Sequence, residues 1–125
     1  MNNKSKLLLL LLVVMIMAFV SSKFFNSNEN NDGLQFANYG NIQYSAHAKC
    51  RMDCRNIDRS EIEEILKEGK LNDSKTRRSS KGISYAMEGW SHDKQHIRVV
   101  CAPKEDKLVI VTVIDVENNW SCDCK

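Results

Sequence analysis

The chain has 125 residues, a net charge of +2 and five cysteines. A charge this close to zero gives no reason to expect nucleic acid or an acidic surface as the partner of the whole molecule. Apart from the N-terminal segments, about 80 residues remain for a folded part, which allows one domain with a small core. Domains of that size are often stabilised by disulfides or by a metal ion.

The first 25 residues have the features of a membrane-targeting segment. Two lysines precede LLLLLLVVMIMAFV, residues 7–20, which contains no charged and no turn-forming residue. A positive start followed by an apolar stretch is typical of a signal peptide, although the VSS at residues 20–22 is a weak cleavage site. Extended to residues 7–25, the segment reaches the length of a membrane-spanning helix. We predict a signal anchor over residues 1–25, with a cleaved signal peptide as the alternative.

The two lysines favour a cytoplasmic N-terminus, which places the rest of the chain outside the cytoplasm. We therefore expect a single-pass protein of the cell membrane, tethered through residues 7–25, with its C-terminal domain exported. If the segment is cleaved, the mature protein is secreted or periplasmic instead.

Residues 26–42 are rich in asparagine and poor in apolar side chains. Such a composition cannot bury enough apolar surface to offset the entropy lost on ordering. We therefore predict a flexible linker over residues 26–42 and a single domain over residues 43–125.

Two helices are predicted at the start of this domain. Residues 45–55 contain no Gly or Pro and are compatible with a short helix. Residues 59–68 carry stronger signals, because an Asp-x-x-Glu capping box precedes them and a glycine follows. In this second helix Glu63 and Lys67 stand at i and i+4, the spacing of a favourable ion pair.

The second half of the domain reads as an antiparallel sheet. A polar, basic loop over residues 72–81 is followed by three stretches with the alternation of strands, at residues 83–88, 96–102 and 108–116. Two helices followed by such a meander indicate an α+β fold, in which two N-terminal helices pack on a three- to four-stranded antiparallel sheet.

The cysteines allow three interpretations, which are a zinc site, disulfides and thiols that stay unpaired. Cys50 and Cys54 lie one helical turn apart, and Cys122 and Cys124 end the chain, so four thiolates are available for a structural zinc site. Alternatively, disulfides join the helix to the C-terminal tail, which an exported location permits. A bridge within the helix is disfavoured, because the Cβ vectors diverge. Cys101 alternates with apolar neighbours and is expected to be buried.

A second set of residues has the chemistry of metal-free RNA cleavage, which needs an acid, a base and cations for the phosphorane. His47 or His96 can act as acid or base near neutral pH. Arg51, Arg55 and Arg98 can bind phosphate through two hydrogen bonds each. The alternatives are that these residues form an anion site without catalysis, or that His47 and Arg51 only stabilise the fold.

The first helix also resembles a known family, the domain of unknown function numbered 4258 (DUF4258). The resemblance rests on a His-Ala pair, an Arg-Met pair, a further Arg, an Ile with a cap and a closing Gly, here His47-Ala48, Arg51-Met52, Arg55, Ile57-Asp58 and Gly69. The strand IVTVIDV, residues 110–116, fits the later part, so that the resemblance covers residues 44–116.

The resemblance implies a fold related to the RelE-like or barnase-like small ribonucleases, in which helices pack on an antiparallel sheet. It implies no assigned activity, and a ribonuclease role inherited through the fold is a weak argument. We therefore expect a binding or structural module with a cysteine staple and no cofactor, or structural zinc as the alternative. The alternative function is a metal-independent ribonuclease that uses His47 and the arginines. The candidate partners are another protein or RNA.

Overall fold

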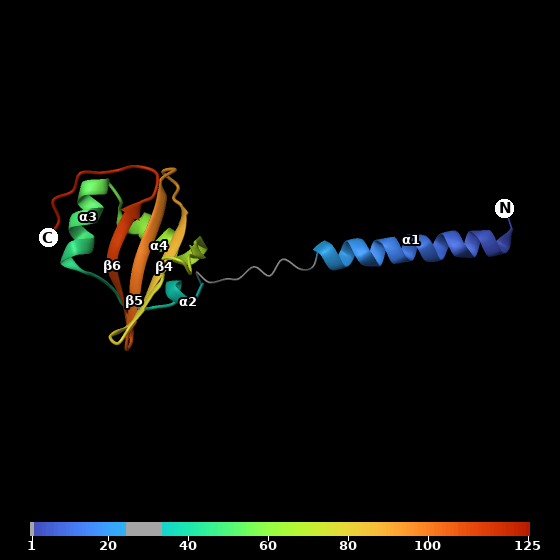
Figure 1. Ribbon diagram of the computed structural model, residues 1–125, viewed down its shortest axis with the longest axis horizontal. Coiled ribbons are helices and arrows are strands. Elements are labelled where there is room, and N and C mark those ends of the chain that lie inside the picture. The colour runs from blue at the N-terminus through green and yellow to red at the C-terminus, as the bar shows by residue number, and fades with distance from the viewer. Residues whose placement is uncertain (1, 25–33) are drawn as a thin grey trace.

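The computed structural model describes residues 2–24 and 34–125 (Figure 1). Helix α1, Asn3–Phe24, contains the predicted anchor segment. Its residues Asn3–Ser21 are long and apolar enough to cross a membrane, a test that signal sequences also pass. Residue 25 and the first part of the expected linker, residues 26–33, lie outside the described residues.

The domain begins earlier than residue 43, where the sequence placed its start. The one-turn helix α2, Leu34–Ala37, and strand β1, Ile42–Tyr44, already belong to it. Phe36 is 2 % exposed and its ring lies 5.1 Å from that of Tyr85. The Asn-rich composition suggested a linker here. One buried aromatic ring, that of Phe36, and the short strand β1 are nevertheless enough to attach this segment to the domain.

Helices α3, Ala46–Arg55, and α4, Arg59–Glu68, form where the sequence predicts them. Ser45 caps α3, since its hydroxyl accepts a hydrogen bond from the backbone N–H of Ala48. The capping box of α4 is complete, because the side chains of Asp58 and Glu61 each accept a hydrogen bond from the other residue's backbone N–H at 2.9 Å.

The sheet has six strands, more than the three or four expected, and it is mixed. The other five strands are β2 (Lys70–Leu71), β3 (Arg77–Ser79), β4 (Gly82–Trp90), β5 (His96–Lys104) and β6 (Lys107–Asp115). The order is β1-β6-β5-β4-β2, with β3 also paired to β4. All neighbouring pairs are antiparallel except β1 and β6, which are parallel.

Two parts of the predicted sheet need correction. The basic loop over residues 72–81 contains β3, which forms a hairpin with β4. Strand β4 also continues to Trp90, two residues beyond the predicted stretch 83–88, because Trp90 pairs with His96 on β5.

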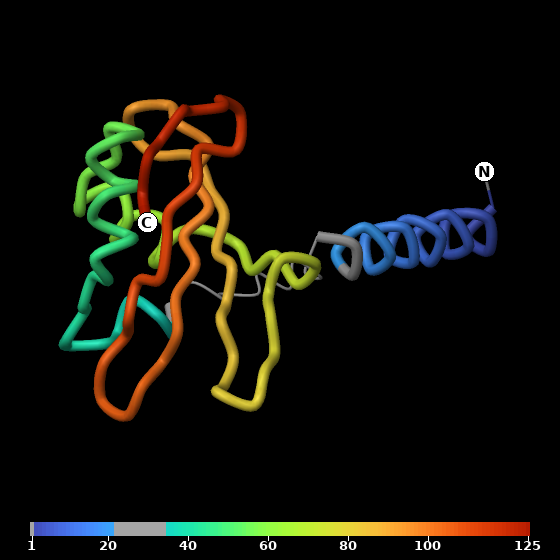
Figure 2. Tube along the Cα trace, turned by 60° about the vertical axis from the view of Figure 1, so that its left-hand side comes forward, coloured from blue at the N-terminus to red at the C-terminus, as the bar shows by residue number. Residues whose placement is uncertain are grey.

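Helices α3 and α4 cover one face of the sheet, and no helix covers the other face in the part of the chain from residue 34 on (Figure 1). Alternate strand residues on the helix side fill the core together with the apolar faces of the helices; fully buried members include Ile62, Ile65, Leu66, Met87, Ile97, Val99 and Val113. By the same alternation, Glu88, His96 and Arg98 lie on the face without helices. The C-terminal tail crosses from the end of β6 to α3 (Figure 2).

Candidate functional site

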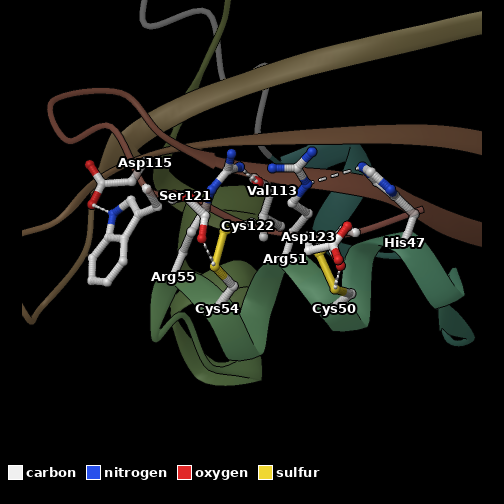
Figure 3. Close-up of a disulfide and its surroundings, with 12 residues drawn as sticks. His47, Cys50, Arg51, Cys54, Arg55, Val113, Asp115, Ser121, Cys122 and Asp123 are labelled. Atoms are coloured by element: carbon white, nitrogen blue, oxygen red, sulfur yellow. Dashed lines mark hydrogen bonds between the residues drawn. A yellow bond between two sulfur atoms is a disulfide. The ribbon is translucent and has the colours of Figure 1, made fainter.

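Two disulfides attach the C-terminal tail to α3 (Figure 3). Cys50 is bonded to Cys124 and Cys54 to Cys122, with Cα atoms 5.8 and 5.9 Å apart. Both distances are in the usual range for disulfides. Of the three interpretations of these cysteines, the structure therefore shows the disulfides.

The pairing follows from the spacing of the cysteines. Four residues along an α-helix rise about 6 Å, and two residues along an extended chain advance about 6.6 Å. A Cys-x-x-x-Cys on a helix therefore matches a Cys-x-Cys on an extended tail. The helix-to-tail bridges predicted from the sequence did not depend on this match. With a tail that returns antiparallel to the helix, the match predicts the observed partners.

The sulfur atoms are not available as zinc ligands in this state. A thiolate binds zinc, and a sulfur in a disulfide is not a thiolate. Among the described residues no group of three or more His, Cys, Asp or Glu side chains is placed to hold a metal ion. Cys101 is the remaining cysteine, a buried free thiol, and burial raises its pKa to about 12.

Asp115, at the end of β6, holds the start of the tail. Its carboxylate is 4 % exposed and accepts hydrogen bonds from the indole N–H of Trp120 at 2.9 Å, from Asn118 and from Gln95. Burial raises the pKa of Asp115, but these hydrogen bonds outweigh burial and hold the pKa below its usual value. The tail is thus attached at two places, through Asp115 and through the disulfides.

His47, Arg51 and Arg55 lie together along α3, on the side that faces the sheet (Figure 3). The Nε of Arg51 donates to Nε2 of His47 at 3.4 Å, and Arg55 donates to the backbone carbonyl of Val113 on β6. Burial and the nearby Arg51 lower the pKa of Arg55. The Arg55 guanidinium therefore joins α3 to β6, a structural role that the sequence had suggested for His47 and Arg51 but not for Arg55.

Arg98 does not join these residues. It lies on the opposite face of the sheet, where its Nε forms an ion pair with Glu88. The four residues proposed as one anion or RNA site, His47, Arg51, Arg55 and Arg98, are thus divided between two faces.

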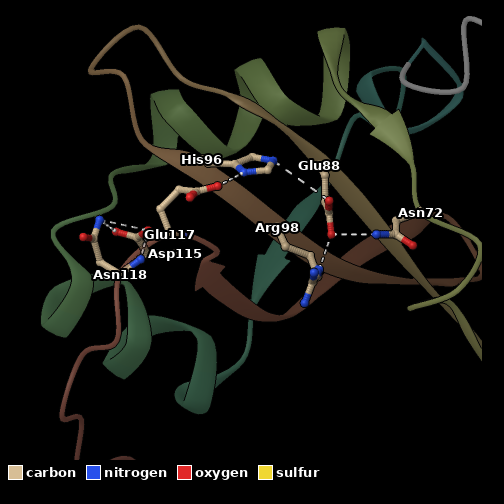
Figure 4. A network of polar contacts seen from close by, with 7 residues as sticks. All are labelled: Asn72, Glu88, His96, Arg98, Asp115, Glu117 and Asn118. Carbon is tan, nitrogen blue, oxygen red and sulfur yellow. Dashed lines mark hydrogen bonds and ion pairs between the residues drawn. The ribbon is translucent and has the colours of Figure 1, made fainter.

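A second polar cluster surrounds Arg98 on the face without helices (Figure 4). The carboxylate of Glu88 pairs with Arg98, accepts a hydrogen bond from the Asn72 amide at 2.8 Å and lies 4.0 Å from Nε2 of His96. The other ring nitrogen of His96, Nδ1, lies 2.8 Å from Glu117. We call Asn72, Glu88, His96, Arg98 and Glu117 the Glu88 cluster.

Trp90 covers one side of this cluster. Its ring stacks on that of His96, with centroids 4.8 Å apart and planes 11° apart, and Trp90 is 61 % exposed. The side chains of Glu88, His96 and Arg98 are 17–22 % exposed, so they are shielded but reachable from solvent. A shielded ionic cluster next to an exposed aromatic ring is a candidate binding site.

Hydrogen bonds keep the Glu88 carboxylate of this cluster ionised. Burial raises the pKa of Glu88, but hydrogen bonds from Arg98 and Asn72 outweigh burial and hold the pKa below its usual value. A carboxylate, an imidazole and a guanidinium therefore lie side by side, and they can accept a proton, give a proton and bind an anion. Glu88 was not among the predicted site residues, although Glu88, His96 and Arg98 alternate onto one face of adjacent predicted strands.

The fold and these sites define a small α+β domain with a disulfide-bonded tail and one sheet face free of helices. The chain belongs to the DUF4258 family, whose description is "domain of unknown function" and whose family model matches residues 44–115. No curated protein and no solved structure matches the chain. The family resemblance noted on the first helix is confirmed.

Proposed function

We propose that the protein is a membrane-anchored module that acts outside the cytoplasm and binds its partner through the sheet face without helices. The observation that carries the location is the pair of disulfides between α3 and the tail, because such bonds persist in oxidising compartments and are rare in the cytosol. The apolar helix α1 supports the anchor, since it is long enough to span the apolar layer of a membrane.

The Glu88 cluster and Trp90 support the binding role. Exposed tryptophan is enriched where proteins contact partners, and the adjacent ionic groups supply orientation. On this account the disulfides hold the tail against α3 and leave the opposite face of the sheet free for the partner.

The location is tested by treating intact cells that express the full chain with a membrane-impermeant amine reagent. The lysines of the domain are expected to react as fully in intact cells as in lysed cells, and the protein is expected to stay with membranes washed at alkaline pH. Reaction only after lysis overturns the proposed location. Release of the protein by the alkaline wash overturns the anchor.

A metal-independent ribonuclease is the second candidate, and the Glu88 cluster is the observation that favours it. Glu88 can act as base toward a ribose hydroxyl, His96 as acid toward the leaving oxygen, and Arg98 can bind the phosphate. Trp90 offers a surface on which a base can stack. In this candidate the chemistry is on the face of the sheet opposite to His47, the residue on which the sequence-based hypothesis relied.

The ribonuclease candidate is tested with the full chain in detergent and several single-stranded RNAs. We expect Glu88→Gln and His96→Ala to abolish cleavage, whereas His47→Ala retains it if its stability is preserved. If only His47→Ala loses cleavage, the catalytic site lies on α3 and not in the Glu88 cluster. Absence of cleavage with every RNA rules out the enzyme and leaves the binding module.

A further inference from the structure

A cavity of about 460 Å³ lies on the helix side of the sheet, away from the Glu88 cluster. It is formed where α4 meets β1 and the segment between α2 and β1. Its wall includes three apolar or aromatic side chains, Ile42, Tyr44 and Leu66, and three charged ones, Arg59, Glu63 and Lys67. Its volume is within the range of small-molecule sites, about 300–1,000 Å³.

The charged residues follow one stripe of α4 with alternating sign. Arg59, Glu63 and Lys67 are spaced four residues apart, so their side chains project from the same side of the helix. The ion pair expected between Glu63 and Lys67 is not formed within 4.0 Å in the part of the chain that the structure covers. A negative group thus lines the cavity between two positive ones.

Tyr44 provides an unpaired polar group at the same place. Its hydroxyl is buried and has no hydrogen-bond partner among the described residues. Arg59 lies over its ring, with the guanidinium carbon 5.0 Å from the ring centroid. A buried hydroxyl without a partner is unfavourable, and a ligand with a polar group at this point relieves that cost.

We propose that this cavity binds a small zwitterion with an apolar side chain, either a free amino acid or a very short peptide. The ammonium group lies against Glu63, the carboxylate against Arg59 or Lys67 with the Tyr44 hydroxyl in reach, and the side chain against Tyr39 and Ile42. A simple anion meets repulsion from Glu63, and a simple cation meets repulsion from two positive side chains. The proposal concerns a different site from the proposed function and does not depend on it.

The direct test is a titration of the full chain in detergent micelles, followed by NMR shifts of the backbone amides of residues 39–44 and 59–67. The probes are leucine and Leu-Leu, which separate the two sources of the zwitterion, together with N-acetyl-leucine and leucine amide, each of which lacks one charge. We expect saturable shifts with leucine or Leu-Leu, and binding at least about tenfold weaker with either blocked compound.

Two results overturn the proposal. One is the absence of saturable shifts with both leucine and Leu-Leu up to about 10 mM. The other is that N-acetyl-leucine or leucine amide binds as tightly as leucine or Leu-Leu, because the site would then recognise a simple anion or a simple cation.

Three variants locate the binding in this cavity. Glu63→Gln and Lys67→Gln change exposed side chains, so the fold is retained, and each is expected to weaken leucine or Leu-Leu binding about tenfold. Glu68→Gln and Lys70→Gln are the matched controls and are expected to bind normally. Tyr44→Phe keeps the ring under Arg59 but removes the hydroxyl, and is expected to weaken binding without lowering the melting temperature. Normal binding in all three cavity variants overturns the assignment.

Discussion

At the scale of single residues, the tail depends on a carboxylate buried at the end of an apolar strand. Asp115 receives hydrogen bonds from the turn before β5 and from the tail, through Gln95, Asn118 and Trp120. The sequence shows Asp115 only as a polar residue within LVIVTVIDV. Its partners cannot be predicted from that pattern, because they come from segments that meet only after the sheet has formed.

Replacement of Asp115 by Asn is expected to lower the free energy of unfolding by about 2 kcal/mol, since it removes a charged acceptor that serves several donors. Chemical denaturation measures the change. Asp106→Asn, in the exposed turn between β5 and β6, is the control and is expected to have little effect. Equal stability of Asp115→Asn and the native chain contradicts this role.

The same residue predicts an acid dependence. Because the pKa of Asp115 is lower in the folded state than its ordinary value of 3.8, the unfolded chain binds a proton first as the pH falls. The stability it contributes is complete above about pH 4 and is lost as the pH falls through the folded-state pKa. The free energy of unfolding, measured by denaturation at several pH values from 6 to 2, should therefore fall less with pH in Asp115→Asn than in the native chain. An equal fall in both proteins contradicts the assignment.

Cys101 gives a separate test at this scale. Its thiol is buried in the core and its pKa is raised to about 12, so both access and ionisation oppose alkylation. We expect no reaction with iodoacetamide at pH 8 in the folded protein and rapid reaction of one thiol after unfolding without reductant. Rapid alkylation of the folded protein contradicts the described core.

At the scale of elements, the two disulfides act as one device. Each alone would close a long loop, since the sequence separation is 74 for Cys50 and Cys124 and 68 for Cys54 and Cys122. Once one is formed, the other closes only a small ring between α3 and the tail. In the chain-entropy account, the first bond contributes about 4.5 kcal/mol and the second about 2.5 kcal/mol.

Removal of one disulfide is therefore expected to cost about 2.5 kcal/mol, and removal of both about 7 kcal/mol. The measurement is chemical denaturation of the paired variants Cys50→Ser with Cys124→Ser, of Cys54→Ser with Cys122→Ser, and of all four together. Costs that simply add, with the double removal equal to the sum of the single ones, contradict the shared-loop account.

A surface contact joins the turn after β4 to α4. His92 Nδ1 lies 2.8 Å from Glu64, and this hydrogen bond raises the pKa of His92 above its ordinary value of 6.5. The contribution of this contact to the stability of the fold is complete below pH 6.5 and is lost as the pH rises through the raised pKa of His92. An NMR titration should show this raised pKa, and Glu64→Gln should return it toward 6.5, whereas Glu63→Gln should not. An unchanged His92 pKa in Glu64→Gln contradicts the contact.

The elements also show how far the sequence predicts the fold. Helices α3 and α4 were predictable because their boundaries are set by local signals, and β4 to β6 because alternation marks them. Strand β1 was missed, since its three residues pair with β6, more than 60 residues later in the chain. The position of Arg98, away from the other three proposed site residues, could not be predicted for a similar reason. Arg98 lies beside Glu88 because of the register between β4 and β5, and local sequence patterns do not give that register.

At the scale of the whole molecule, an apolar helix precedes a disulfide-bonded domain whose sheet has one face free of helices. The two features support the proposed location, because a helix of this length and composition can serve as a signal anchor or a signal peptide and the disulfides suggest an oxidising compartment. In the proposed anchored module, the Glu88 cluster and the cavity lined by Tyr44 lie on opposite sides of the sheet.

The most direct test of this account is the intact mass of the protein taken from membranes of its own host, acid-quenched, unfolded and alkylated with and without prior reduction. We predict the mass of the uncleaved chain, with one alkyl group before reduction and five after it. Three or more alkyl groups before reduction contradict the oxidising location, and a mass that lacks the first 22 or so residues contradicts the anchor.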